Sequence, residues 1–289
     1  MKKFTKFLWI AFAAFSMTFA SCSDDNNGDE PEVNPEEVAF VKNVFPLGLP
    51  ASIDGCKLTV NDKGQLTKVT IPDDPDEENG SIDAEIIFEY GDFSRATKFN
   101  VHMYVLENGE INTDSYIQLN EKGFATYVEE SEDGDLYYKY HFTYNNDDQL
   151  ASVKGIEIEN GHEDEITEHK LTYSNGDITR IQTYYDGELS EDVKYVYINS
   201  AHKQPVANKG CIMLFSDDGC FDIYFDEVKW AFYAGFLGKA TKNLPMGYIV
   251  EDESEEFEWE LNSDQLPVKF YDCKDCFEDN YPDVVISWK

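Results

Sequence analysis

The fold is decided by the stretch Leu58-Thr59-Val60-Asn61-Asp62-Lys63-Gly64-Gln65-Leu66-Thr67-Lys68-Val69. It begins with alternating apolar and polar residues, passes through Asn, Asp and Gly, and ends in a Leu-x-x-Val pattern. Asn, Asp and Gly adopt positive φ angles at small steric cost, so they reverse the chain between two strands. The stretch therefore predicts a β-hairpin.

The same pattern recurs along the chain. Clear copies are Phe142-Thr143-Tyr144-Asn145-Asn146-Asp147-Asp148-Gln149-Leu150-Ala151-Ser152-Val153 and Leu171-Thr172-Tyr173-Ser174-Asn175-Gly176-Asp177-Ile178-Thr179-Arg180-Ile181, with looser copies at 117–127 and 261–269. Residues i and i+3 of a regular strand lie on opposite faces, so the Leu-x-x-Val ending predicts a β-bulge just after each turn. Successive hairpins predict a mainly β fold, a long antiparallel meander that curls into a barrel-like or strongly twisted sheet.

The strands outside these turns alternate between apolar and polar residues. Tyr138, Tyr140, Phe142 and Tyr144 share one face, while the residues between them are mostly polar. This alternation is typical of half-buried antiparallel strands. The outward positions carry Glu, Lys, Asp and Thr, which argues against the apolar outer band of a membrane barrel.

One helix is predicted over residues 226–237. Asp226 is placed to cap its N-terminus and Gly238 to end it. Beyond the first turn the segment is apolar on nearly every face, so we expect it to be buried against the concave side of the sheet. Whether it fills the barrel or leaves an open cavity is not decided by the sequence.

The charge balance excludes several classes of partner. Of 289 residues, 58 are Asp or Glu and 23 are Lys or Arg, which gives a net charge of −35. Affinity for phosphate backbones comes from Lys and Arg, so we expect no nucleic-acid partner. Hydrophobic residues make up 42% of the chain and aromatics 15%, which is enough for a packed core.

The N-terminus has the features of a bacterial lipoprotein. Residues 1–21 are predicted to be a signal peptide, because they have a basic start and an apolar centre. Phe19-Ala20-Ser21-Cys22 resembles a lipobox, so Cys22 is predicted to carry acyl chains that anchor the protein to the outer membrane. Residues 22–37 are predicted to be an acidic disordered tether, and residues 38–289 a single β domain. The acidic run after Cys22 resembles the export tag of surface lipoproteins in Bacteroidetes, which favours the cell surface over the periplasm-facing alternative.

Together, the hairpin repeats, the segment 232–245 (Phe-Tyr-Ala-Gly-Phe-Leu-Gly-Lys-Ala-Thr-Lys-Asn-Leu-Pro) and the lipoprotein start resemble an uncharacterised family of Bacteroides-type outer-membrane lipoproteins. The resemblance implies a porin-like β fold, a domain of unknown function, and no catalytic residues to carry over. The hairpin pattern is also similar to the tyrosine-aspartate repeats of large bacterial shell toxins.

Few residues suggest a cofactor. Cys273 and Cys276 are predicted to form a local disulfide, with free thiols and a metal site as the alternatives. A bridge between Cys211 and Cys220 does not fit a regular hairpin, because the two would lie about 13 Å apart along the strand. Asp73, Asp74 and Asp76 are weak calcium candidates, since they lack the regular spacing of a calcium loop and a solvated acidic loop is the default explanation. Apart from the lipid on Cys22, no cofactor is expected.

Aromatic residues give the remaining functional indication. Tyr184 and Tyr185 are adjacent on a predicted strand, so one of them must face outward and is a candidate ligand contact. We predict a non-catalytic, lipid-anchored surface protein that binds a glycan or a protein partner. A structural or adhesive envelope component without a small-molecule site is the alternative, and a glycosidase-like enzyme is a second one. The sequence leaves the ligand and the oligomeric state open.

Overall fold

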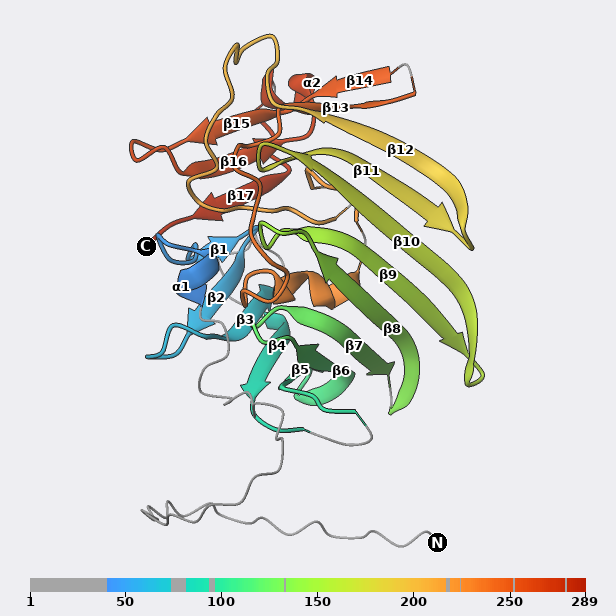
Figure 1. The fold of residues 1–289 in the computed structure, drawn as a ribbon. Coiled ribbons are helices and arrows are strands. Elements are labelled where there is room, and N and C mark those ends of the chain that lie inside the picture. Colours follow the sequence, from blue (N-terminus) through green and yellow to red (C-terminus); the bar gives the residue numbers. More distant parts are fainter. Residues whose placement is uncertain are drawn as a thin grey trace, which may run out of the picture. The chain divides into compact units, whose positions relative to one another are not determined.

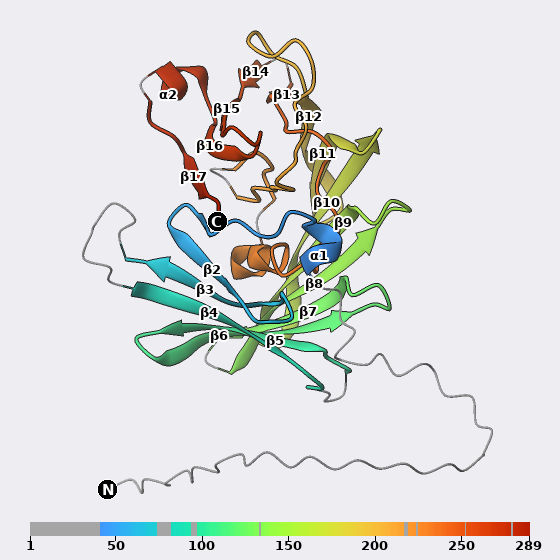
Figure 2. The same cartoon turned by 90° about the vertical axis from the view of Figure 1, so that its left-hand side faces the viewer.

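An antiparallel sheet that curls around a buried segment makes up the fold (Figures 1 and 2). The computed structural model describes residues 41–73, 82–93, 97–132, 134–216, 219–223, 225–251, 253–278 and 280–289. These residues contain 17 strands joined in one sheet and lie in one compact unit. The predicted signal peptide and tether lie outside the described residues.

The central part of the sheet is a meander of long strands. These are β2 (Cys56–Val60), β3 (Leu66–Pro72), β4 (Ile82–Tyr90), β5 (Val101–Glu107), β6 (Glu110–Leu119), β7 (Ala125–Glu132), β8 (Asp135–Tyr144), β9 (Leu150–Glu159), β10 (His162–Ser174), β11 (Asp177–Tyr185) and β12 (Glu188–Val196). The shorter strands are β1 (Ser52–Ile53), β13 (Gly247–Val250), β14 (Glu253–Glu256), β15 (Glu258–Leu261), β16 (Pro267–Tyr271) and β17 (Val284–Ser287). The described helices are α1 (Val41–Val44), η2 (Asp226–Ala231) and α2 (Lys274–Glu278).

Strand pairing brings the two ends of the meander almost together. From β2 to β14 each strand pairs with the next, always antiparallel. At the other end, β15, β16, β17, β1 and β2 pair in that order. Within the described residues no pairing joins β14 to β15, so one seam keeps the barrel-like sheet from closing. The predicted fold class is confirmed.

An asparagine side chain stabilises most of the repeated turns in the same way. In four of them the Oδ1 atom of an asparagine accepts hydrogen bonds of 2.9–3.0 Å from the backbone N–H groups two and four residues later. These asparagines are Asn61, Asn120, Asn145 and Asn262. The turn between β10 and β11 instead places Asn175 and Gly176 at φ 54° and 89°, as a tight two-residue turn requires. The local chemistry of the turns therefore fixes the hairpins.

The predicted bulge follows the turn. In the first hairpin Thr59 pairs with Lys68 and Val60 with Leu66, which leaves Thr67 as the extra residue. As a result Leu66 and Val69, three residues apart, are both fully buried at 0% exposure. The hairpin of β8 and β9 shifts register at the same point. The bulge prediction is confirmed.

Tyrosines tie neighbouring hairpins together. Four of them sit at the end of a strand and donate a hydrogen bond of 2.6–2.9 Å to a carbonyl near the start of the preceding strand. They are Tyr90, Tyr144, Tyr173 and Tyr197. Burial raises the pKa of each phenol, so all four stay protonated donors. These tyrosines therefore tie each hairpin to its neighbour in the sheet.

Part of the segment between β12 and β13 lies on the concave side of the sheet. Figure 2 shows the helical turn η2, in orange, enclosed by the curled strands. The buried helical segment was predicted here, but it is shorter and tighter than expected, a 3₁₀ turn over Asp226–Ala231. Phe225 holds the N-cap position without a side-chain hydrogen bond, so the predicted cap by Asp226, which has a φ of 38°, is wrong.

The end of this helical segment also differs from the prediction. Phe236 N donates to Ala231 O at 2.9 Å and Gly235 N to Phe232 O at 2.8 Å, with Gly235 at φ 84°. This is the Schellman arrangement, in which the glycine takes the left-handed conformation. Gly235, not Gly238, therefore ends the helical segment.

The residues after Gly235 run across the hairpin turns. Phe236 O accepts hydrogen bonds from Ala125 N at 2.8 Å and from the Tyr144 hydroxyl at 2.9 Å. Asn243 is held by Asp177, whose carboxylate accepts from the Asn243 backbone and side chain at 2.8 and 2.7 Å. The repeated hairpins and the segment 232–245 are therefore joined by hydrogen bonds. Among the described residues, no helix is long and apolar enough to cross a membrane.

Candidate functional site

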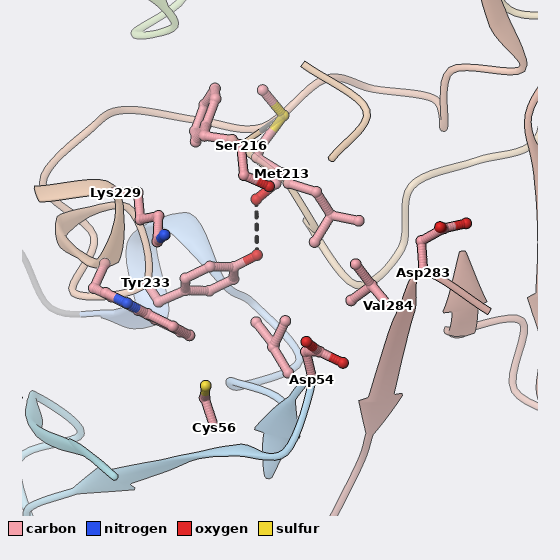
Figure 3. A pocket seen from close by; sticks show the side chains of 12 residues that line it. Asp54, Cys56, Met213, Ser216, Lys229, Tyr233, Asp283 and Val284 are labelled. Atoms are coloured by element: carbon pink, nitrogen blue, oxygen red, sulfur yellow. Dashed lines mark hydrogen bonds between the residues drawn. The ribbon is translucent and has the colours of Figure 1, made fainter. Parts of the chain in front are cut away.

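A cavity of about 240 Å³ lies where three separate parts of the chain meet. The hairpin of β1 and β2 contributes Ile53, Asp54 and Cys56, and the start of β17 contributes Val284 with Asp283 just before it. The interior segment contributes Met213–Ser216, Lys229, Trp230 and Tyr233. Figure 3 shows Tyr233 reaching across it, with Lys229 and Asp283 on opposite sides. The wall is mixed, since apolar and aromatic side chains alternate with two carboxylates and one ammonium group. This composition is typical of a small-molecule site.

The aromatic side of the cavity is rigid. The Tyr233 hydroxyl donates to Met213 O at 2.8 Å, and its ring stacks on Phe45 with centroids 5.9 Å apart. The Trp230 ring lies 5.9 Å from the Tyr233 ring and is 7% exposed. These rings are positioned before any ligand arrives, so little conformational entropy is lost on binding.

The cavity holds a thiol that is not a nucleophile. Burial raises the pKa of Cys56 to about 11, and the carboxylates of Asp54 and Glu227 add to the rise while Lys229 opposes it. A thiol with this pKa is almost entirely protonated at neutral pH, and only the thiolate attacks electrophiles. Cys56 therefore contributes a small polarisable surface to the cavity wall.

The Trp230 indole, which lines the cavity, also interacts with Glu227, which does not. Burial raises the pKa of Glu227, and a hydrogen bond from the Trp230 side chain partly opposes this rise. The Trp230 Nε1 and Glu227 Oε2 atoms are both buried. The Trp230 N–H is therefore directed to Glu227 inside the fold, and the indole contributes its ring to the cavity wall.

A fully buried carboxyl lies on the strand wall that faces η2. Glu130 of β7 is 0% exposed, and its carboxyl accepts hydrogen bonds from Ser115 Oγ at 2.8 Å and from the Tyr137 hydroxyl. Burial raises its pKa to about 7, the two hydrogen bonds oppose the rise, and Asp226 and Glu227 add to it. The interior therefore contains several carboxyls that disfavour one another's charge.

A second cavity, of about 360 Å³, has an acidic wall. Its lining includes four carboxylates together with the rings of Tyr195, Tyr248 and Phe257; the carboxylates are those of Glu191, Asp222, Glu253 and Glu255. No basic residue is among its described lining residues. Burial, with Asp222 adding to it, raises the pKa of Glu191. This cavity repels anions.

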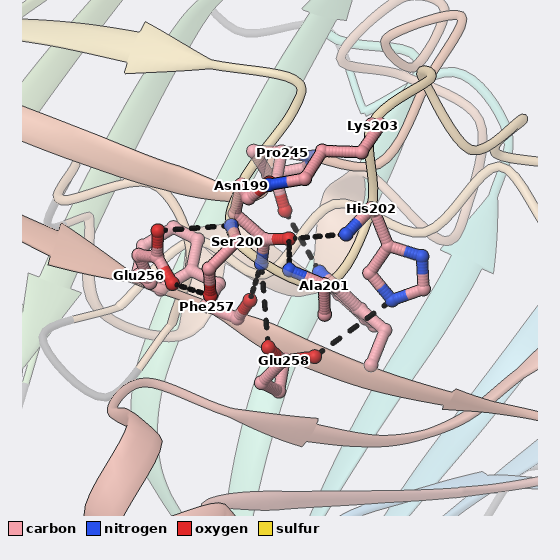
Figure 4. A network of polar contacts seen from close by, with 10 residues as sticks. Asn199, Ser200, Ala201, His202, Lys203, Pro245, Glu256, Phe257 and Glu258 are labelled. Carbon is pink, nitrogen blue, oxygen red and sulfur yellow. Dashed lines mark hydrogen bonds and ion pairs between the residues drawn. The ribbon is translucent and has the colours of Figure 1, made fainter.

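The seam of the sheet carries a polar network that is structural. Asn199 accepts hydrogen bonds from the backbone of Ala201 and His202, and its amide donates to Phe257 O at 2.8 Å (Figure 4). His202 also faces Glu258, with Nε2 and Oε2 3.7 Å apart. These contacts fasten the loop after β12 onto the junction of β14 and β15. His202 is thus explained by the seam and not by catalysis.

Comparison with known protein families identifies the family of this chain. Residues 58–269 match the family described as a domain of unknown function (DUF4595) with porin-like fold. The chain belongs to this family. The resemblance predicted from the hairpin repeats and the segment 232–245 is thereby confirmed. The matched range includes the interior side of the cavity, while Asp54, Cys56 and Asp283 lie outside it.

The solved structures that resemble this chain have low sequence identity to it. A porin-like protein from Bacteroides uniformis is 19% identical, with 74% of this chain and 79% of that chain covered and a TM-score of 0.54. A porin-like protein from Bacteroides vulgatus is 14% identical, with 83% and 99% covered and a TM-score of 0.41. A Photorhabdus luminescens toxin complex is 11% identical, with 75% and 10% covered and a TM-score of 0.31. A search of curated proteins found no match.

The predicted aromatic pair does not line either cavity described above. Tyr185 is 46% exposed, whereas Tyr184 is half-buried, with Lys170 Nζ 4.3 Å from its ring centroid. Tyr185 is therefore the outward-facing member of the pair.

The predicted cysteine and calcium positions have different outcomes. Cys273 and Cys276 form a disulfide at the start of α2, and with Asp272 they are the one group of metal-ligating side chains among the described residues. Cys56, Cys211 and Cys220 are free thiols. Asp73 is exposed at the end of β3, while Asp74 and Asp76 lie outside the described residues, as does Cys22.

Sequence reasoning missed the residues of the cavity. Asp54, Cys56, Trp230 and Asp283 come from distant segments that only the closing of the sheet brings together. One sequence feature could have pointed to the cavity: Glu227 and Trp230 carry hydrogen-bonding groups in a segment otherwise predicted to be buried and apolar.

Proposed function

We propose that this protein is a non-catalytic binding protein of the outer membrane, anchored through acyl chains on Cys22 and exposed at the cell surface, which holds a glycan in the cavity beside Trp230. The observation that carries the proposal is the preformed cavity lined by the rings of Trp230 and Tyr233. The lipobox and the acidic run after it support the anchor and the surface location. The porin-like proteins of Bacteroides with similar structures are consistent with a protein of the envelope.

The side chains packed inside the curled sheet favour a binding function over the transport of a solute. The concave side is occupied by fully buried side chains, among them Val228, Phe236 and Leu244, each at 0% exposure. A transport pore needs a continuous polar lumen, which such packing does not provide. The cavity near Trp230 is a pocket in this packing.

The chemistry at the cavity favours binding over catalysis. The Cys56 thiol, whose pKa is raised to about 11 by burial, is protonated at neutral pH and is not a nucleophile. A glycosidase needs a matched acid and base at a set separation. We assign Asp54 and Asp283 to ligand recognition and not to these two roles.

A binding screen tests the proposal. The mature lipidated protein, purified in detergent micelles, is applied to a glycan array that spans neutral, acidic and amino sugars, and positive spots are titrated by calorimetry. We expect binding that Trp230→Ala abolishes. If no glycan binds, the structural or adhesive role without a small-molecule site replaces this proposal.

A further inference from the structure

We infer that the disulfide of Cys273 and Cys276 is a redox-active site, which accepts two electrons from the thiols of a partner polypeptide. The inference concerns the surface at α2 and goes beyond the proposed function of the cavity, on which it does not depend. It starts from the unlike surroundings of the two sulfur atoms.

The bridge closes a very short loop. Cys273 and Cys276 are three positions apart in the sequence, and their Cα atoms are 5.3 Å apart. A disulfide stabilises a protein mainly by restricting the unfolded chain, and the stabilisation grows with the length of the loop that is closed. We therefore expect this bridge to contribute little to the stability of the fold.

The two sulfur atoms have different hydrogen-bonding neighbours. The backbone N–H of Cys276 donates to Cys273 Sγ at 3.1 Å. Cys276 Sγ lies 3.5 Å from Asp272 Oδ1, and the oxygens of an ionised carboxylate only accept. The first sulfur thus has a donor beside it, and the second has an acceptor.

This arrangement suits the reduced pair better than the disulfide. A disulfide sulfur carries no proton, so Cys276 has nothing to donate to Asp272 in the oxidised form. After reduction the Cys276 thiol donates to Asp272, while a Cys273 thiolate accepts from the Cys276 N–H. Hydrogen bonds to a charged form favour that form, and a disulfide is easier to reduce when its reduced form is stabilised. The geometry therefore favours a thiolate on Cys273 and a neutral thiol on Cys276.

The disulfide is open to a partner. Both cysteines are only half-buried, and Asp275 between them is exposed. Two aromatic residues next to the bridge are exposed as well, Phe277 at 41% and Tyr281 at 75%. Their backbone N–H groups donate to Cys273 O at 3.2 Å and to Cys276 O at 2.9 Å, respectively. Exposed rings beside the bridge provide contact area for a polypeptide that a small thiol cannot use.

The free thiols of the described residues are unlike this pair. Burial raises the pKa of Cys56 to about 11 and that of Cys220 to about 12, and it also raises the pKa of Cys211. Because the thiolate is the reactive form, we expect these three thiols to be inert at neutral pH. They serve as internal controls for the reactivity of the pair.

The proposed exchange has two steps. A thiolate of the partner attacks Cys276 Sγ and forms a mixed disulfide; the bond between the two cysteines breaks, and its electron pair stays on Cys273, the better leaving group. A second partner thiolate then attacks the partner sulfur of the mixed disulfide, and Cys276 leaves and takes up a proton from water. The partner is oxidised to a disulfide, and the pair is reduced by two electrons to one thiolate and one thiol.

Site-resolved alkylation of the native full-length protein tests the assignment. The protein in detergent micelles is incubated at neutral pH with millimolar reduced glutathione and then with iodoacetamide, and the alkylated peptides are quantified by mass spectrometry. We expect the pair to be reduced without denaturant. Cys273 should then be alkylated about tenfold faster than Cys276 and than the three free thiols.

Asp272→Asn tests the acceptor beside Cys276. The variant removes the negative charge that keeps the Cys276 thiol protonated, so we expect alkylation of Cys276 to rise several-fold and the preference for Cys273 to fall. Asp275→Asn is the matched control, because it makes the same change on an exposed residue, and its alkylation pattern should equal that of the wild type. The order of alkylation in the wild type stands without either variant.

Matched tripeptides test the choice of a polypeptide partner. Acetylated and amidated Gly-Cys-Gly and Phe-Cys-Phe carry the same thiol and no net charge. We expect the aromatic peptide to reduce the pair several-fold faster, and Tyr281→Ser to diminish this advantage. Leu189→Ser, which changes an apolar residue of β12 that is 52% exposed, is the control and should preserve it.

Each outcome decides one level of the inference. If the native pair stays oxidised in millimolar glutathione and is reduced only in urea, the bridge is structural and the inference is wrong. If the pair is reduced but Cys276 is alkylated first, or as fast as Cys273, the thiolate assignment is wrong. Equal rates with the two tripeptides would overturn the polypeptide partner. None of these results affects the proposed binding of a glycan in the cavity.

Discussion

The buried carboxyl of Glu130 predicts a specific pH dependence of stability. Its pKa is raised from 4.5 to about 7 in the folded state, because the side chain is fully buried. A folded-state pKa above the unfolded value means that the folded protein binds the proton more tightly. The stabilising contribution is therefore complete below pH 4.5 and is lost as the pH rises through 7. A difference of this size corresponds to about 3 kcal/mol.

The variant Glu130→Gln isolates this contribution. Glutamine has a similar shape, can accept a hydrogen bond from Ser115 or Tyr137, and does not titrate. We expect the stability of the wild type relative to the variant to fall by about 2–3 kcal/mol between pH 5 and pH 8.5. Urea denaturation followed by tryptophan fluorescence at several pH values measures the difference. The lower limit stays above the sequence pI of about 4.2, where the protein is least soluble.

The control is Glu129→Gln, one residue earlier on the same strand and half-buried. It makes the same chemical change outside the buried site. If the wild type and Glu130→Gln lose stability in parallel from pH 5 to pH 8.5, Glu130 is ionised in the folded state at low pH, and the argument from burial is refuted.

Three further predictions concern the anchor, the turns and the interior. Cys22→Ala should leave the protein in the soluble fraction after cell lysis, and a variant that remains fully membrane-bound would contradict the lipid anchor. Asn145→Ala removes two turn hydrogen bonds and should lower the free energy of unfolding by about 1–2 kcal/mol, whereas Asn146→Ala in the same turn should change it by less than about 0.5 kcal/mol. Phe236→Ala, at 0% exposure, should cost about 3–5 kcal/mol in urea denaturation, and a value near that of the exposed Tyr281→Ala would show that the interior segment is not packed as described.

The hairpins were predictable from sequence because their determinants are local. Asn61 and Asn145 each build a turn with their own side chain and the next four residues, so the pattern survives in the sequence alone. The bulge was readable for the same reason, since the spacing of Leu66 and Val69 requires it. The disulfide of Cys273 and Cys276 also spans only three residues.

The helical segment was predicted only in part. Its burial followed from its composition, but the predicted end at Gly238 was wrong, although Gly235 and Gly238 both take positive φ angles, of 84° and 82°. Gly235 ends the helix, whereas Gly238 lets the chain approach the turn at Asp148, where a Cβ atom would lie 2.6 Å from the carbonyl oxygen. Sequence alone does not distinguish these two reasons for a glycine.

The candidate site was not predictable, because it depends on long-range closure of the sheet. Asp54 and Asp283 approach each other only because β17 pairs with β1. The interior segment then brings Trp230 to the same place from the middle of the chain. No motif spacing in the sequence indicates that these three segments lie together.

The most direct test of the account is the NMR spectrum of the tryptophan indole groups during a titration with a glycan that binds in the array screen. Trp259 and Trp288 donate to carbonyls of Pro245 and Pro267 and do not line the cavity, whereas Trp230 lines it. We predict that the Trp230 indole resonance shifts with increasing sugar concentration while the other two stay in place. An unchanged Trp230 resonance at saturating sugar would contradict the central claim that this cavity binds the ligand.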